Sequence, residues 1–345
     1  MTQFVSRRTM LKALGAGGMM LTGGVSMASA KSHKEVGTVE EVYSFDTPSE
    51  LPPFGELPEN VAIDKQGNKY VSVSSQGQVW KFSPGNEPIS APLTQFTTGG
   101  AFLVGPTGLE ADPQGTVYVC FASDYATNGA DTNGVWAIDE DGEKELFAEI
   151  STDTLSFPND IALFGDSLLV TDSFTGVVWR VWKDTTQPWA DHPLLKPALA
   201  PPQSPGTPGS FGANGIALSK DKKTVYVSNN ATGEIIKIPV NEDGSSGTPT
   251  TFTGGLIAPD GIALDTKENV YVADNAGNQI VCVSSDGTTE PLASGSPLDF
   301  PADVTFGTAR GEQKSLFIVN LAFSSNPNPA LLKLDVGVPG LPIRR

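Results

Sequence analysis

The sequence is poor in the residues that build thiolate metal sites, catalytic triads and membrane spans. Among 345 residues there are two Cys and two His, so a zinc-type cluster is excluded. No GxSxG motif provides a nucleophile elbow, and no stretch beyond residue 30 reaches the roughly 20 apolar residues of a membrane span. Cys120 and Cys282 lie in apolar segments of repeats that are not neighbours. We therefore expect two small buried hydrophobic side chains rather than a disulfide or a metal pair.

Positive charge is also scarce. The chain holds 22 Lys and Arg against 39 Asp and Glu, which gives a formal net charge of −17. Such a chain repels phosphate backbones and anionic lipid, so neither nucleic acid nor a membrane surface is an expected partner. It attracts cations instead. Acidity that serves only solubility is the alternative interpretation.

The first 30 residues have the pattern of an export signal. Arg7 and Arg8 precede a weakly apolar, Gly-rich run, and Ala28-Ser29-Ala30 forms a small-x-small cleavage site. Paired arginines resemble a twin-arginine signal, with a general secretion signal as the alternative. We therefore predict that residues 1–30 are removed, that the product is periplasmic or secreted, and that residues 31–345 fold as one domain.

One unit recurs six times along the rest of the chain. It consists of a polar-to-apolar run, an Asp-Gly-type turn and a Tyr-Val-like strand, followed by further β-branched segments. The six copies begin at residues 58, 106, 158, 213, 259 and 301. They predict an all-β, six-bladed β-propeller with four-stranded blades. The strand-like run at 37–45 would complete the last blade and close the ring. The Pro-rich insert at 183–212 is either a solvated loop or a lid.

In a propeller, the residues that open the innermost strands encircle one mouth of the central channel. We assign this position to Glu59, Thr107, Asn159, Asn214, Asp260 and Asp303. All offer oxygen and none is basic, and converging carboxylates repel one another unless a cation lies between them. Carboxylate and amide oxygens suit Ca²⁺, with Mg²⁺ or Mn²⁺ as alternatives. The competing interpretation is that these polar residues only cap strands and turns.

A second set of equivalent positions, in the Tyr-Val strands, lies beside this ring. It is apolar in the first two blades and polar in the other four, the six residues being Val73, Phe121, Asp172, Asn229, Asp274 and Asn320. Together with the mouth ring, this set predicts a substrate pocket that includes Phe157, Thr107, Asp172 and Asp303.

Four segments, PENVAID, FPNDIAL, GANGIAL and PDGIALD, resemble the metal-site segments of the regucalcin/gluconolactonase family. Members of that family are six-bladed propellers that bind calcium and hydrolyse lactones, and the resemblance covers roughly residues 36–337. It implies that Ca²⁺ is held by Glu59, Asn159, Asn214 and Asp260, and that Asp260 is also the general base. Sugar-lactone hydrolases of the family tend to carry an Arg two residues before the PND-type Asn. This chain has Phe157 there, which favours a more apolar ester or lactone.

Three functions remain open from the sequence. The first is an exported, calcium-dependent hydrolase that acts as a monomer on a small-molecule lactone or ester. The second is a non-catalytic, NHL-type ligand-binding propeller, and the third is a strictosidine-synthase-like propeller. Carboxylates at the axis favour the first over the second, because a binding surface has no need of them there. Only a substrate separates the first from the third.

Overall fold

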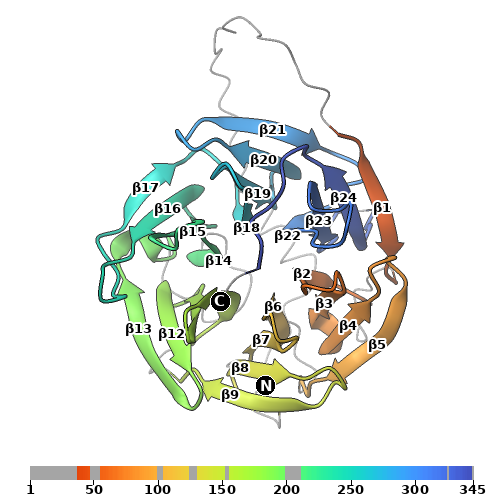
Figure 1. Ribbon diagram of the computed structural model, residues 1–345, viewed down its shortest axis with the longest axis horizontal. Coiled ribbons are helices and arrows are strands. Elements are labelled where there is room, and N and C mark those ends of the chain that lie inside the picture. The colour runs from red at the N-terminus through yellow and green to blue at the C-terminus, as the bar shows by residue number, and fades with distance from the viewer. Residues whose placement is uncertain are drawn as a thin grey trace, which may run out of the picture.

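The chain forms a ring of six four-stranded antiparallel sheets (Figure 1). This architecture is seen in a computed structural model that describes residues 37–46, 55–98, 104–123, 130–151, 155–198, 211–324 and 326–343. Helix in these residues is limited to two 3₁₀ turns, η1 (Ser74–Gln76) and η2 (Pro193–Leu195). No helix in the same ranges is long and apolar enough to cross a membrane. The predicted six-bladed β-propeller is confirmed, whereas the predicted export signal lies outside the described residues.

The first three blades follow one another along the chain, each running from the axis outward. Blade 1 consists of β2 (Pro58–Ile63), β3 (Lys69–Val73), β4 (Gln78–Phe82) and β5 (Pro88–Gln95). Blade 2 consists of β6 (Gly105–Ala111), β7 (Val117–Ala122), β8 (Gly134–Ile138) and β9 (Lys144–Glu149). Blade 3 consists of β10 (Pro158–Phe164), β11 (Ser167–Asp172), β12 (Val177–Trp182) and β13 (Thr185–Asp191).

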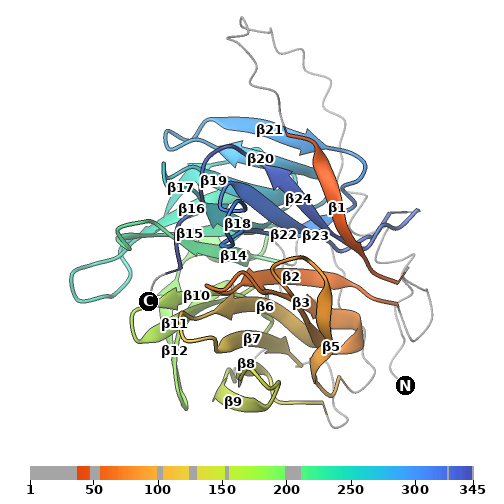
Figure 2. The ribbon, with the colours of Figure 1, turned by 45° about the vertical axis from the view of Figure 1, so that its right-hand side comes forward.

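The other three blades repeat the arrangement, and the last one borrows its outer strand. Blade 4 consists of β14 (Ala213–Leu218), β15 (Thr224–Asn229), β16 (Glu234–Pro239) and β17 (Thr250–Thr253). Blade 5 consists of β18 (Pro259–Leu264), β19 (Val270–Asp274), β20 (Gln279–Val283) and β21 (Thr289–Ser294). Blade 6 consists of β22 (Pro301–Phe306), β23 (Ser315–Asn320), β24 (Ala330–Asp335) and the N-terminal β1 (Val39–Ser44). Because β1 pairs with β24, the predicted closure is confirmed (Figure 2).

Burial explains why each inner strand is apolar after its polar opening residues. Each lies between two neighbouring blades, and β10 is buried at all seven positions, whereas the outer strand β5 is mostly exposed. In blades 1, 2 and 5 the turn after the inner strand is fixed by an Asp, whose carboxylate accepts two backbone N–H groups. In blade 1, Asp64 accepts from Gln66 and Asn68, both at 2.9 Å. These turns are the repeated Asp-containing motif seen in the sequence.

The apolar core is divided among the six interfaces between blades. Each interface has one cluster of buried side chains contributed by two adjacent blades. The interface between blades 3 and 4, for example, brings together Leu169, Val178, Ile216 and Val227. Since each blade buries its faces against its neighbours, the ring is held at every joint, including the joint between blades 6 and 1.

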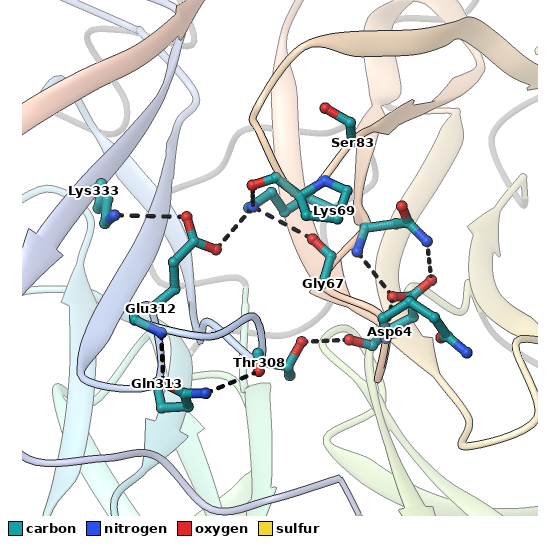
Figure 3. A network of polar contacts seen from close by, with 12 residues as sticks. Asp64, Gly67, Lys69, Ser83, Thr308, Glu312, Gln313 and Lys333 are labelled. Carbon is teal, nitrogen blue, oxygen red and sulfur yellow. Dashed lines mark hydrogen bonds and ion pairs between the residues drawn. The ribbon is translucent and has the colours of Figure 1, made fainter.

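A buried ion pair reinforces the joint between the last and the first blade (Figure 3). Lys69 of β3 has a fully buried side chain, and its ammonium lies 3.0 Å from a carboxylate oxygen of Glu312 in blade 6. It also donates to the Pro84 carbonyl at 3.1 Å and lies over the Phe317 ring at 4.6 Å. Lys333 contacts the other oxygen of Glu312 at 3.6 Å. Every polar group of this network therefore has a partner.

The insert expected at 183–212 is irregular only in part. Thr185–Asp191 forms β13, the outer strand of blade 3, and Trp189 is buried in the core between blades 3 and 4. Pro188 did not prevent this because it lies in an outer strand, which has a free edge. His192 accepts a hydrogen bond from the Leu194 N–H and caps η2. Residues 199–210 of the predicted loop lie outside the described residues, so the lid remains a prediction.

Candidate functional site

The mouth of the channel is lined by residues near the start of successive inner strands. Glu59, Asn159, Asn214 and Asp260 are each the second residue of their strand. In these blades the first residue pairs with the residue predicted for the second set, as Pro158 does with Asp172 and Pro259 with Asp274. Strand β6 begins one residue earlier, so Thr107 is its third residue, but Thr107 likewise follows a proline, Pro106, that pairs with Phe121. The repeats therefore bring these five side chains to one level of the ring.

Asp303 was assigned to the wrong position of the repeat. Pairing of Pro301 with Asn320 makes Pro301 the first residue of its strand, so the second is Ala302. Ala302 is buried in the core between blades 6 and 1. Asp303 is therefore one level deeper in the channel, equivalent to Asn60 and Asp160. The prediction was wrong because the segment PAD was matched to the other repeats by its carboxylate, whereas the prolines are the equivalent residues.

Side chains at this deeper level join neighbouring blades. Their oxygens accept hydrogen bonds from backbone N–H groups of the next blade: Leu109 donates to Asn60 at 2.9 Å, Ile216 to Asp160 at 2.9 Å, and Val61 to Asp303 at 3.1 Å. The other three blades have Gly at this level, and a Cβ on Gly261 would lie 1.9 Å from the Asp303 carboxylate. Asp160 and Asp303 thus hold the ring together beneath the mouth.

Glu59 and Asp260 are buried carboxyl groups whose charges repel each other. Burial raises the pKa of Glu59 well above its usual value, and Asp260, Asp303 and Asp160 raise it further. Burial and then Asp160 likewise raise the pKa of Asp260, opposed by hydrogen bonds from Asn214 and Asn275. The charges that raise these two pKa values are all carboxylates. As far as the described residues go, the mouth is therefore a place where acidic groups are held without a basic partner.

Two oxygens at this level have no hydrogen-bond partner among the described residues although they are buried. They are Oε2 of Glu59 and Oδ1 of Asn214. An unsatisfied buried acceptor is unfavourable by about 1–3 kcal/mol, and more if it is charged. Both atoms are oxygens of the kind that Ca²⁺ binds. The residues present therefore fit a hard divalent cation.

The other two members of the predicted ligand set are held in place by neighbours. The amide of Asn159 donates to Ser173 Oγ at 3.0 Å, and Ser173 in turn donates to the Ala213 carbonyl at 2.7 Å. Asp260 accepts from Asn275 at 3.2 Å. Within the described residues no three Asp, Glu, His or Cys side chains converge closely enough to hold a metal ion. The set from the sequence differs from such a cluster because it combines two carboxylates with two amides.

Two predicted pocket residues make hydrogen bonds that serve the fold. Thr107 donates to the Pro158 carbonyl at 2.7 Å. Asp172 accepts from the backbone N–H groups of Phe157, Phe174 and Thr175, so it fixes the loop that enters blade 3. Asn229 and Asp274 make corresponding contacts in the next blades. For this second set of positions, the structure favours the alternative interpretation of capping.

The lower half of the channel contains a buried acid that sequence reasoning missed. Glu110 lies in a cavity of about 200 Å³, which is covered by Leu341–Ile343 of the C-terminal segment that crosses the ring (dark blue in Figure 1). Burial and Asp160 raise the pKa of Glu110 to about 8, and burial raises that of Asp160 to about 7. The residue four positions after the Pro or Ala that opens each repeat could have revealed it. Five blades have Ala or Thr there, and only blade 2 has a charged residue.

Comparisons with known proteins agree with this architecture. A family profile described as SMP-30/Gluconolactonase/LRE-like region matches residues 208–321. The chain is 24% identical to a lactonase, drp35, of Staphylococcus aureus over 238 residues, which are 66% of this chain and 67% of the relative. A gluconolactonase structure from Xanthomonas campestris superimposes with a TM-score of 0.62 at 19% identity, covering 87% of this chain and 89% of the other. A regucalcin from Agrobacterium tumefaciens, described as calcium-binding, gives 0.62 at 14% identity, covering 88% and 95%. Residues 208–321 of the chain thus match the SMP-30/Gluconolactonase/LRE-like family model, and the whole propeller has the fold of the gluconolactonase and regucalcin structures.

Proposed function

We propose that the protein is a metal-dependent hydrolase of lactones or esters, with Ca²⁺ held by Glu59, Asn159, Asn214 and Asp260. The observation that carries the proposal is the pair of buried, unpartnered oxygens of Glu59 and Asn214 in a mouth that holds negative charge without a basic partner. The lactonase relative and the gluconolactonase structure support the reaction class.

The arrangement suits attack by water on a carbonyl group. When bound, the cation supplies positive charge that polarises the carbonyl oxygen and stabilises the oxyanion that develops there. Asp260 takes the proton of the attacking water, while Asn275 holds one of its carboxylate oxygens. Burial raises the pKa of Asp260, and a carboxyl group with a raised pKa is a stronger base. Asn159, fixed by Ser173, keeps its amide in one orientation.

Hydrolysis assays with and without calcium test this proposal. The full chain, stripped of metal, should hydrolyse small lactones and aryl esters only after Ca²⁺ is added. Asp260→Asn should lower kcat by about 10²–10⁴-fold, the usual range for a general base. Glu59→Gln should weaken calcium binding in a titration. Asp286→Asn, at an exposed turn of the same blade as Asp260, is the matched control and should change neither. Equal activity of Asp260→Asn and the unaltered protein would refute the proposal.

We further propose that the protein is exported as a folded monomer after loss of residues 1–30. The support is the paired arginines and the small-x-small site of the sequence. Cell fractionation of the unaltered chain and of an Arg7→Lys, Arg8→Lys variant tests the route, and sedimentation of the product tests the monomer. Retention of the unaltered chain in the cytoplasm at full length would overturn the export proposal.

A further inference from the structure

A cluster of aromatic rings lies beside two of the proposed metal ligands. Phe157 is two residues before Asn159, and Phe211 is three residues before Asn214. With Phe174 they form what we call the aromatic rim. Ring centroids are 4.9 Å apart for Phe157 and Phe174, 5.6 Å for Phe157 and Phe211, and 5.3 Å for Phe174 and Phe211.

The aromatic rim is separate from the six cores between blades. Its buried members cluster with Ala122 and are packed by Leu155 and Phe211. Polar contacts anchor the rim to the mouth: Asp172 accepts from the backbone N–H groups of both Phe157 and Phe174. The rings are therefore fixed relative to Asn159, which is held by the adjacent Ser173. A rigid apolar wall next to the proposed metal ligands is the result.

A second apolar side chain precedes the proposed ligand of blade 5. Ile257, three residues before Asp260, is 60% exposed, and its backbone N–H donates to Asp274. Among the described residues only two large hydrophobic side chains are exposed, and the other, Ile89, lies on the outer strand β5. Ile257 is therefore free to contact an apolar ligand near Asp260.

Charged groups that could hold sugar hydroxyls are engaged elsewhere. Lys196 lies next to the rim, but its ammonium donates to the Thr175 carbonyl at 2.8 Å and pairs with Asp191 at 2.5 Å. Phe157 itself occupies the place from which a basic side chain could reach a substrate at Asn159. Beside the proposed ligands in blades 3 to 5, the mouth therefore has the apolar side chains of Phe211 and Ile257.

We propose that Ile257 and Phe211, the latter backed by the buried rings of Phe157 and Phe174, bind the apolar part of the substrate, so that the protein selects lactones or esters with alkyl or aryl substituents over polyhydroxylated lactones. This inference rests on the proposed hydrolase function and specifies its substrate class. An alkyl chain laid against the rim loses contact with water, whereas hydroxyl groups there would lose hydrogen bonds without replacement.

Three substrates separate this inference from the proposed function. They are γ-butyrolactone, the γ-lactone with an unbranched pentyl chain, and glucono-1,5-lactone, each assayed with the full chain in excess Ca²⁺. We expect kcat/KM for the pentyl lactone to exceed that for γ-butyrolactone by about tenfold or more, because a few methylenes become buried. The glucono-lactone should be the poorest of the three.

Variants then locate the selectivity. Ile257→Ser and Phe211→Ala should each lower the pentyl-to-unsubstituted ratio by about fivefold, whereas Ile89→Ser, which removes an equally exposed Ile far from the mouth, should leave the ratio unchanged. Phe157→Arg should shift preference towards glucono-lactone. Since Phe157 is buried, the exposed Ile257 keeps the test decisive if that variant fails to fold.

The outcomes differ for the two claims. Hydrolysis of glucono-lactone as fast as the pentyl lactone, or an unchanged ratio in both Ile257→Ser and Phe211→Ala, would overturn the inference while the hydrolase proposal stands. Absence of hydrolysis of any lactone or aryl ester in calcium would overturn both.

Discussion

Two buried groups of charge in this propeller are built in opposite ways. At the joint between blades 6 and 1, Lys69 is fully buried but faces Glu312, two carbonyl groups and an aromatic ring. In the channel mouth, Glu59 and Asp260 are buried with other carboxylates, and Oε2 of Glu59 has no partner. Every charge of the first group has a partner within the chain. The second group needs a cation from outside to balance its carboxylates.

The difference separates stability from function. Removing one partner of a buried ion pair leaves an uncompensated charge and is strongly destabilising, although the intact pair adds little. Like charges buried together lower stability as they stand, which makes the mouth a candidate for a ligand or a reaction. The joint is therefore expected to respond to mutation and the mouth to calcium.

The largest expected effect is that of calcium on the mouth. A ligand present at a thousand times its Kd stabilises the folded state by about 4 kcal/mol, which corresponds to roughly 10 °C in Tm for a domain of this size. A thermal melt of the full chain in EDTA and in excess Ca²⁺ measures the shift. Identical Tm values in EDTA and in Ca²⁺ would mean that the mouth binds no calcium, which would contradict the proposed difference between mouth and joint.

At the joint, Lys69→Met should lower the free energy of unfolding by about 3 kcal/mol, because Glu312 loses its closest partner. Calcium affinity should stay the same, since the joint is not part of the mouth. Lys333→Met is the matched control: its side chain is 26% exposed and 3.6 Å from Glu312, so the loss should be within about 1 kcal/mol. Denaturant unfolding measures both. A weakened calcium affinity in Lys69→Met would show that the two regions are coupled.

The pH dependence of the metal-free protein should follow the acids of the channel. The folded chain keeps Glu110 protonated up to its pKa of about 8, whereas the unfolded chain releases that proton near pH 4.5. The resulting stability is present below pH 4.5 and is lost as pH rises towards 8. We expect a fall of about 3 kcal/mol between pH 5 and pH 8, given that one pKa unit corresponds to about 1.4 kcal/mol. Glu110→Gln should make the free energy of unfolding less dependent on pH. An unchanged pH dependence would mean that Glu110 does not have the raised pKa.

The smallest expected effect is that of Asp260→Asn on the free energy of unfolding. Unlike the other substitutions, it should raise the stability of the metal-free protein. Neutralising one of the like charges should stabilise the metal-free protein by about 1 kcal/mol, while abolishing most of the gain from calcium. Denaturant unfolding with and without Ca²⁺ gives the two values. Destabilisation in EDTA would mean that Asp260 serves the fold in the way Asp172 does.

The sequence predicted the fold because its repeats carry local chemistry. The Asp-containing turns and the apolar inner strands mark each blade, and the extra strand at 37–45 has only one free edge to join. It placed Glu59, Asn159, Asn214 and Asp260 at one level for the same reason. It misplaced Asp303 because strand register depends on pairing, which is not visible in a single repeat. Thr107 and Asp172 showed their backbone partners only after the chain folded, and Glu110 was hidden because its neighbours in space come from five other blades.

A crystal structure of the full chain grown with calcium tests the central claim most directly. The account predicts anomalous density in the mouth, with oxygens of Glu59, Asn159, Asn214 and Asp260 at about 2.3–2.6 Å from the ion, as is typical of calcium. A mouth without density at saturating calcium, or an ion bound elsewhere while these four side chains point away from one another, would contradict it.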